Sequence, residues 1–175
     1  MEGVKEMEEV KRKVEQERQL VIFSLYGEEF GLEITKVREI VKPREITRLP
    51  NVIDFVEGVT NLRGEVIPII DLKKRFGVQA TEMTDDSRII IVDISSNRVG
   101  LVVDDVTEVL RIAENDIDPP PRTVAGLKAE YIQGIGKMGE RLLILLDVDK
   151  ILSSEEKIEL KAEVLSEELT EAAGA

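Results

Sequence analysis

The sequence contains no cysteine, no histidine and no tryptophan. Without cysteine there are no disulfides and no thiolate chemistry, and without histidine there is no imidazole zinc site. Catalytic triads built on either residue are excluded, as is histidine acting as a general base. Aromatic residues make up only 3% of the chain, which leaves little surface for stacking nucleic-acid bases. These absences exclude the commonest nucleophilic and zinc-dependent enzymes.

Basic residues are also in short supply, because 24 of them face 36 acidic ones and leave a net charge of −12. Nucleic acids and anionic lipids both select clustered lysine and arginine, so neither is an expected partner. No run approaches the ~18 uninterrupted apolar residues of a membrane span. The N-terminal stretch MEGVKEMEEVKRKVEQER lacks the apolar segment of a secretory signal. We therefore expect a cytoplasmic protein with no direct membrane insertion.

Hydropathy divides the 175 residues into a body and two tails. Residues 1–18 form a charged N-terminal arm, which is too poor in apolar side chains to pack. Residues 153–175 form an acidic C-terminal helix or tail, in which Ser153 and Glu156 fit a capping box. The body, residues 19–152, alternates short apolar runs with turn residues, a pattern typical of strands.

Local signals within the body predict hairpins and short helices. Apolar runs flank Gly27-Glu28 and residues 95–97, which predicts two hairpins. Asp71 and Asp147 each end an apolar run and precede a helix-sized segment, so both are expected N-caps. Gly77 is the expected left-handed terminus of the first of these helices.

The body also contains an internal repeat. Residues 22–42 align with 91–111, and residues 57–76 align with 133–152. Chance agreement between two β-rich segments is the alternative, but the order, the hairpin position and the strand–Asp–helix ending all recur. A duplication predicts two β-units, at about 22–77 and 91–152. Each would have about five short antiparallel strands curled into a barrel, and the two would meet along a groove.

The turn Asn61-Leu62-Arg63-Gly64 separates two apolar runs of the first repeat. The aligned segment of the second repeat reads KMGE, so an arginine there is not required for the fold. This predicts a role for Arg63 beyond structure. The alternative is that Arg63 caps a carbonyl or pairs with a nearby acid.

Residues 34–41, ITKVREIV, carry apolar side chains at helical spacing, with Glu39 among them and recurring as Glu108. They predict either an amphipathic turn packed on its own barrel or part of an exposed groove for a partner helix. Pro68 interrupts an apolar run, which predicts an edge strand or a bulge.

No motif in the sequence marks a catalytic site. Asp104-Asp105 could hold a magnesium ion after parallel βα units, but the hairpin pattern favours a solvated turn. Phosphate-binding glycine loops, nucleophile elbows and EF-hand spacings are absent. Nothing singles out one pair of carboxylates. We therefore expect no catalytic residues, no metal and no cofactor.

Three segments carry a resemblance to a known family: EGVTNLRGEVIPIIDLKKRFG, FGLEITKVREIV and RVGLVVDDVTEVLRI. Over about residues 18–152 the chain resembles the CheW-like domain family of chemotaxis coupling proteins. The resemblance implies a mainly β fold, with two SH3-like five-stranded β-barrels packed together, a few short helices and a C-terminal helical tail. It implies a non-enzymatic adaptor that joins the cytoplasmic tips of chemoreceptors to the regulatory domain of the histidine kinase CheA.

The resemblance also implies functional residues. Asn61, Leu62, Arg63 and Gly64 match the family's signature turn. Receptor or kinase coupling is implied for Val37, Glu39, Ile40, Gly58, Arg63, Val106 and Val109. Kinase binding is also expected at the exposed segment 43–49, at Ile46, Thr47 and Arg48. Because Val37 and Val106 are equivalent in the repeat, one receptor helix could meet both units across the groove.

Two other functions share these features. An adaptor of another sensory pathway would have the same fold, and a regulatory domain could bind a small molecule in the groove between the barrels. Without histidine the chain has no phosphotransfer domain, and it has no doubly wound receiver domain. We therefore expect a stand-alone adaptor, monomeric when free and part of a receptor array when assembled.

Overall fold

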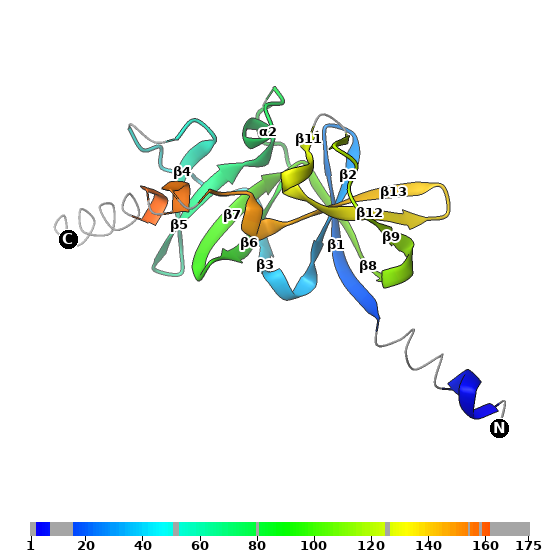
Figure 1. Ribbon diagram of the computed structural model, residues 1–175. Helices are drawn as coiled ribbons and strands as arrows, with labels where there is room; N and C mark the ends of the chain where they lie inside the picture. The colour runs from blue at the N-terminus through cyan, green and yellow to red at the C-terminus, as the bar shows by residue number, and fades with distance from the viewer. Residues whose placement is uncertain are drawn as a thin grey trace.

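The computed structural model describes residues 3–7, 16–50, 53–79, 81–124, 127–153, 155–157 and 159–161. One sheet consists of β1 (Glu17–Leu25), β2 (Glu28–Glu33), β8 (Asp105–Ala113), β9 (Ile117–Asp118), β12 (Ile132–Met138) and β13 (Arg141–Leu146). The other consists of β3 (Val37–Val41), β4 (Val56–Leu62), β5 (Glu65–Asp71), β6 (Arg88–Ile94) and β7 (Asn97–Val103). We call the first sheet with its interior unit A and the second unit B; they lie side by side (Figure 1).

Short elements connect and flank the two sheets. They are η1 (Ile34–Lys36), α2 (Leu72–Arg75), η2 (Glu114–Asp116), β10 (Thr123–Val124), β11 (Leu127–Lys128), η3 (Ala129–Tyr131) and η4 (Val148–Lys150). The mainly β fold with a few short helices confirms the prediction. Within the described ranges, no helix combines the length and the apolarity needed to cross a lipid bilayer.

The two units do not coincide with the two repeats. The strand orders are β8-β1-β2-β13-β12-β9 in unit A and β3-β6-β7-β5-β4 in unit B. Unit B is therefore continuous from residue 37 to 103, whereas unit A is assembled from residues 17–33 and 105–146. The expected division into one unit at 22–77 and another at 91–152 is wrong, because each repeat gives its first hairpin to the other repeat's sheet.

The exchange itself supports the duplication. In unit A, β13 runs parallel to β2 with Leu145 opposite Gly31, and in unit B, β5 runs parallel to β7 with Ile69 opposite Gly100. These four residues correspond in the repeat alignment, so the five strands of unit B share order and register with five strands of unit A, which has β9 in addition. Each exchanged hairpin runs parallel to one of its two new neighbours, β13 in unit A and β5 in unit B, so the all-antiparallel expectation fails at one strand pair in each unit.

The predicted caps form at equivalent places in both repeats. The Asp71 carboxylate accepts hydrogen bonds from the backbone N–H groups of Lys73 (2.9 Å) and Lys74 (3.4 Å), and the Asp147 carboxylate accepts one from Asp149 (3.2 Å). Gly77 ends the first helical turn with φ 75°, as predicted. Burial raises the pKa of Asp71, while the two N–H donors act in the opposite direction.

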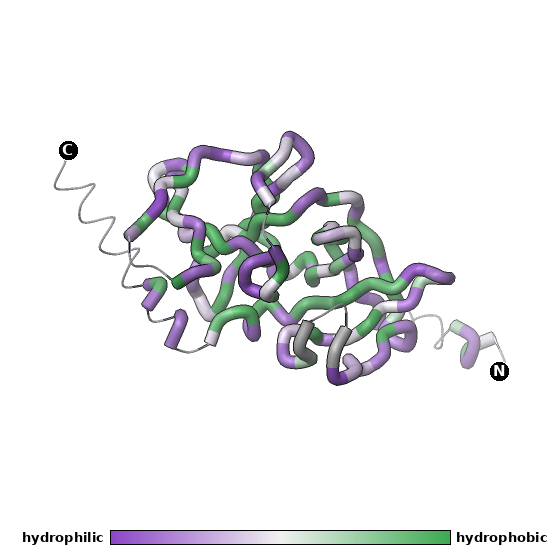
Figure 2. Tube along the Cα trace, turned by 90° about the horizontal axis from the view of Figure 1, so that it is seen from above, coloured by the Kyte–Doolittle hydropathy of each residue, from purple (hydrophilic) through white to green (hydrophobic). Residues whose placement is uncertain are grey.

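Three apolar clusters hold the molecule together, and hydrophobic stretches run through the middle of both units in Figure 2. The interior of unit A contains Leu20, Ile22, Ile112, Leu143 and Leu145, and the interior of unit B contains Leu62, Ile67, Ile69, Ile89, Ile91 and Val102. The third and largest cluster draws on both units, from Phe23 and Phe30 of unit A to Phe55 and Phe76 of unit B. The junction between the units is thus packed with buried side chains.

Two local expectations need correction. Residues 37–41 form the strand β3, although their apolar side chains have helical spacing, because η1 occupies only residues 34–36. Strand β5 is an inner strand between β4 and β7, but its pairing with β7 begins only at Ile69. Pro68 therefore lies where β5 has a partner on one side only, which makes its missing N–H harmless.

The described part of the C-terminal segment is helical at residues 155–157 and 159–161 and packs on unit B. The predicted capping box forms: Ser153 N–H donates to Glu156 Oε1 at 2.7 Å, and Glu156 N–H donates to Ser153 Oγ at 3.2 Å. Leu160 is only 4% exposed and joins the shared core. At the N-terminus residues 3–7 are helical, and the predictions for residues 8–15 and 162–175 lie outside the described residues.

Candidate docking site

Arg63 forms an ion pair with Glu39 on the surface of unit B. The turn Arg63-Gly64 has φ 53° and 86°, and its backbone is held by the Asn61 side chain, whose Oδ1 accepts from Gly64 N–H at 2.8 Å. Arg63 Nη1 donates to Glu39 Oε1 at 3.2 Å, and Nη2 donates to Oε2. The Arg63 side chain is 69% exposed and that of Glu39 33% exposed. The pair is therefore accessible to another protein.

This pair joins the two edges of unit B. Glu39 lies on β3 and Arg63 follows β4, and these are the outermost strands of the sheet. The hydrogen bond from Arg63 lowers the pKa of Glu39, and the charges of Arg63, Arg44 and Arg98 contribute in the same direction. Glu39 therefore remains an anion in this setting at neutral pH.

Unit A contains a counterpart of the pair. Glu108, the repeat equivalent of Glu39, accepts a hydrogen bond from Arg141 Nη2 at 2.9 Å. Arg141 also donates to both carboxylate oxygens of Glu29, at 2.9 and 3.1 Å. Arg141 begins β13, two residues later than the position aligned with Arg63. The argument that the second repeat lacks such an arginine is therefore wrong.

The position of Arg63 is explained by an ion pair whose acidic and basic residues are exchanged between the two units. Glu29 and Arg141 of unit A correspond to Arg98 and Glu65 of unit B, which pair at 2.5 Å. With an acid at position 65, Glu39 has no cation at the place of Arg141, and Arg63 supplies one. The alternative reading, that Arg63 pairs with a nearby acid, thus describes its contacts.

Exposed aliphatic side chains neighbour these ion pairs in sequence. Ile40 is 38% exposed beside Glu39, Val109 is 51% exposed beside Glu108, and Leu142 is 61% exposed beside Arg141. They are the large hydrophobic residues exposed among the described residues of the body, 19–152. We call the set Glu39, Ile40 and Arg63 patch B, and the set Glu108, Val109, Arg141 and Leu142 patch A. Glu39 and Ile40 are consecutive on the edge strand β3, as Glu108 and Val109 are on the edge strand β8, so the side chains of each pair project from opposite faces of the strand.

The remaining expected coupling residues divide by exposure. Val37 and Val106, which are equivalent in the repeat, are half-buried and pack against the shared core. Ile46 is half-buried against the interior of unit B, whereas Thr47 and Arg48 are exposed. Val37 and Val106 thus offer a partner less surface than their neighbours in the two patches.

Gly58 has a structural reason to be glycine. Its φ is +149°, and an added Cβ would lie 2.1 Å from the carbonyl oxygen of Thr47. Thr47 and Val59 exchange two backbone hydrogen bonds, at 2.8 and 2.9 Å, which attach the segment 43–49 to β4. Gly58 therefore supports the segment expected to bind the kinase, rather than contributing a contact surface itself.

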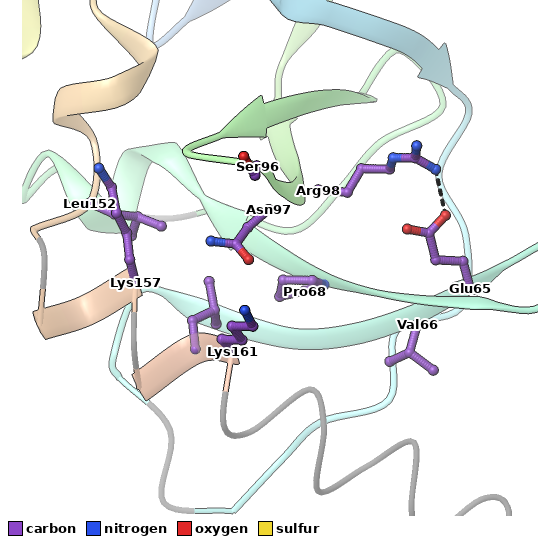
Figure 3. A pocket seen from close by; sticks show the side chains of 10 residues that line it. Glu65, Val66, Pro68, Ser96, Asn97, Arg98, Leu152, Lys157 and Lys161 are labelled. Carbon is purple, nitrogen blue, oxygen red and sulfur yellow. Dashed lines mark hydrogen bonds and ion pairs between the residues drawn. The ribbon is translucent and has the colours of Figure 1, made fainter.

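Asp104 and two cavities bear on the alternative functions. Asp104 accepts from Lys73 Nζ at 2.6 Å and from the N–H of Tyr26 at 2.9 Å, so it is not a solvated turn residue. One cavity of about 220 Å³ lies between β5, the β6–β7 turn and the C-terminal helix, and its lining includes Pro68, Asn97 and Lys161 (Figure 3). Another of about 480 Å³ is lined by unit B residues such as Arg44 and Lys74. Both are lined by residues of unit B, joined in the first by residues of the C-terminal segment.

Comparison with known proteins assigns the fold to a family. The model of the CheW-like domain matches residues 19–156. The chain belongs to the CheW-like domain family. It is 43% identical to a chemotaxis protein CheW of Klebsiella aerogenes, covering 79% of this chain and 84% of that protein. It is 38% identical to a chemotaxis protein CheW of Treponema pallidum, with the same coverage.

The solved structures of this family include a similar chain. The crystal structure of the scaffolding protein TtCheW from Thermoanaerobacter tengcongensis aligns with a TM-score of 0.73 and 42% sequence identity. The alignment covers 79% of this chain and 90% of that one. The two chains therefore share the same fold over most of their length.

Sequence reasoning missed two residues of patch A, Arg141 and Leu142. The signal for Arg141 was present, because the second hairpin reads KMGERLLILL with an arginine just past the turn. In the gapless alignment of the two repeats, Arg141 lies opposite Glu65 and not opposite Arg63. Its similarity to Arg63 as a partner of the repeated glutamate is therefore not visible in that alignment. No sequence signal distinguishes the exposed Leu142 from its buried neighbours, since the whole run is apolar.

Proposed function

We propose that this protein is a non-enzymatic adaptor of bacterial chemotaxis, which couples chemoreceptor tips to the regulatory domain of the histidine kinase CheA. The single observation that carries this proposal is the presence of two exposed patches, A and B, one on each unit. Each combines an arginine–glutamate pair with an exposed aliphatic side chain. Such a mixture of charge and apolar surface suits reversible protein contacts of about 800 Å² per partner.

The family supports the choice of partners. Its members named above are two chemotaxis proteins and one scaffolding protein. In the proposed role the protein works in the cytoplasm, is monomeric when free, and joins receptor arrays at the membrane through its partners. Catalysis belongs to the kinase, and the adaptor holds the two proteins in a defined arrangement and passes conformational bias between them.

Individual residues take the following proposed roles. Arg63 and Glu39 form the centre of patch B, where the guanidinium presents a planar, fixed set of donors to a partner. Val109, Glu108 and Arg141 form the corresponding surface of patch A. Val37 and Val106 support the strands on which the exposed residues lie. The segment 43–49, with Ile46, Thr47 and Arg48, is the proposed kinase-binding edge.

An amide chemical-shift titration tests the proposal. Labelled protein is titrated with a receptor-tip fragment and, separately, with the CheA regulatory domain. We expect two distinct sets of shifted amides, one including β3 or the turn at Arg63 and the other including β8 or the start of β13. Shifts from both partners on one common patch, with mutual competition, would refute the two-surface adaptor.

A matched pair of variants strengthens this test. Arg63→Asn removes the guanidinium of patch B. Arg88→Asn removes a guanidinium that, among the described residues, donates to the carbonyls of Asp85 and Ser87, at 2.7 and 2.6 Å. Arg63→Asn should weaken binding of the partner that changes the amide chemical shifts of β3. Arg88→Asn should leave the affinities for both partners unchanged. Equal losses in both variants would show that Arg63 has no specific part in docking.

A further inference from the structure

Arg75, the last residue of α2, contacts both units and the C-terminal segment at once. Its guanidinium lies over the ring of Phe55 in unit B, at 4.7 Å, and over the ring of Tyr131 beside unit A, at 5.1 Å. Arg75 Nε donates to the carbonyl oxygen of Ile151 at 2.6 Å, and Nη2 donates to Glu156 Oε1 at 3.1 Å. The side chain is only 17% exposed, so solvent screens these contacts weakly.

The repeat explains why this position can reach both units. Phe55 and Tyr131 are equivalent in the repeat, and each carbonyl accepts the backbone N–H of an N-cap, Asp71 and Asp147 respectively, at 2.9 Å. Ile151 is the repeat equivalent of Arg75 itself. Arg75 therefore lies between two matching rings and bonds to its own counterpart, which places it where the two halves of the duplication meet.

The two repeats carry chemically different residues at this position. Ile151 is fully buried, whereas its equivalent is a charged arginine with two aromatic and two hydrogen-bonding partners. A planar guanidinium stacks on rings and donates in fixed directions, whereas a lysine ammonium meets a ring only as a point charge and its donors rotate freely. The contact thus specifies an orientation between the units that apolar packing alone leaves less defined.

We propose that Arg75 is a positioning residue that fixes unit A relative to unit B and thereby links the occupancy of patch A to that of patch B. This inference rests on the proposed adaptor function, because the linkage concerns the two docking surfaces. Among the described residues, the ring contacts and hydrogen bonds of Arg75 involve Phe55, Tyr131, Ile151 and Glu156, which belong to neither patch. Its effect on a partner is transmitted through the orientation of the units.

The test uses the full chain and the variant Arg75→Lys, which keeps the charge but loses the stacking geometry. The matched control is Arg88→Lys, because Arg88 also donates to backbone carbonyls but only within unit B. Residual dipolar couplings of backbone amides, measured without partners, report the relative orientation of the units. The native orientation of unit A relative to unit B should fit the couplings of the native protein and of the control, whereas Arg75→Lys should require a different orientation.

The second readout is linkage between partners. The dissociation constant of the CheA regulatory domain is measured with and without saturating receptor-tip fragment. We expect the two values to differ by about fivefold or more in the native protein and to converge in Arg75→Lys. Binding of either fragment alone should stay within about threefold of native, because the patches themselves are intact. An unchanged ratio in Arg75→Lys, or no linkage in the native protein, overturns the inference.

A milder variant guards against loss of folding. Glu156→Gln keeps the capping box, because glutamine also caps at this position, but removes the charge that faces Arg75. It should reduce the linkage by an intermediate amount, and an unchanged ratio counts against the inference. If neither fragment binds native protein, the adaptor function fails; the dipolar couplings then still decide whether Arg75 sets the orientation.

Discussion

At the scale of single residues, Arg63 combines a conformational cost with an exposed charge. Its φ of 53° lies in the left-handed region, which asparagine tolerates better than arginine. Arg63→Asn should therefore keep the melting temperature within about 4 °C of native, equivalent to about 1 kcal/mol. Receptor control of the kinase should nevertheless be lost. A larger fall in melting temperature would make the residue structural instead.

The same variant predicts a change at Glu39. Because Arg63 lowers the pKa of Glu39, its removal should raise that pKa toward the ordinary glutamate value, as followed by carboxyl carbon shifts. A pKa lower in the folded than in the unfolded state stabilises the fold at neutral pH, and this contribution disappears as pH falls below about 4. In Arg63→Asn, the free energy of unfolding should no longer show this contribution from Glu39 as the pH falls. Identical titration of Glu39 in both proteins would contradict the ion pair.

Gly58 predicts a stability effect that could be mistaken for lost docking. In Gly58→Ala the new Cβ would meet the Thr47 carbonyl, so the segment 43–49 must separate from β4, at a cost of more than about 3 kcal/mol. Gly64→Ala is the matched control, because Gly64 also has positive φ but open space around it, and should cost about 1 kcal/mol. Urea unfolding measures both, and equal losses would show that the close approach is relieved cheaply.

At the scale of elements, sequence signals predicted what depends on near neighbours. The hairpins, the N-caps at Asp71 and Asp147, and the capping box at Ser153 each need only a few consecutive residues. The partners of each hairpin could not be predicted, because the same alternating pattern fits a sheet of its own repeat or of the other. The pairing of Arg63 with a nearby acid was one of the predicted possibilities. The matching role of Arg141 could not be predicted, because it depends on the register between β12 and β13.

The C-terminal helix supplies the prediction at this scale. Leu160 is 4% exposed in the shared core, so Leu160→Ala should destabilise the protein by about 2–4 kcal/mol. Glu159 is exposed on the same short helix, and Glu159→Ala should change stability by less than about 0.5 kcal/mol. Thermal or urea unfolding distinguishes the two. A negligible effect at Leu160 would mean that the helix is a dispensable tail.

At the scale of the whole molecule, the units are bound together by both chain path and packing. The chain passes from unit A into unit B and back again, and the largest apolar cluster contains residues of both. Phe30 of unit A stacks on Phe76 at 6.4 Å, and Phe76 contacts Tyr131 at 5.5 Å. An adaptor that transmits bias between two surfaces needs such a continuous core, since independently moving units would dissipate it.

This architecture predicts a single cooperative unfolding transition. Neither sheet can lose its strands without exposing the shared core, so the slowest-exchanging amides of β1 and β2 in unit A and of β6 and β7 in unit B should report the same opening free energy. Native-state hydrogen exchange at increasing denaturant measures this for both sheets in one sample, and calorimetry should show one peak whose calorimetric and van't Hoff enthalpies agree. If unit B, which is continuous in sequence, exchanged its amides at a distinctly higher free energy than unit A, it would be an independent domain. The two docking surfaces would then have to communicate through the chain crossings near residues 34–36 and 104 rather than through the packed core.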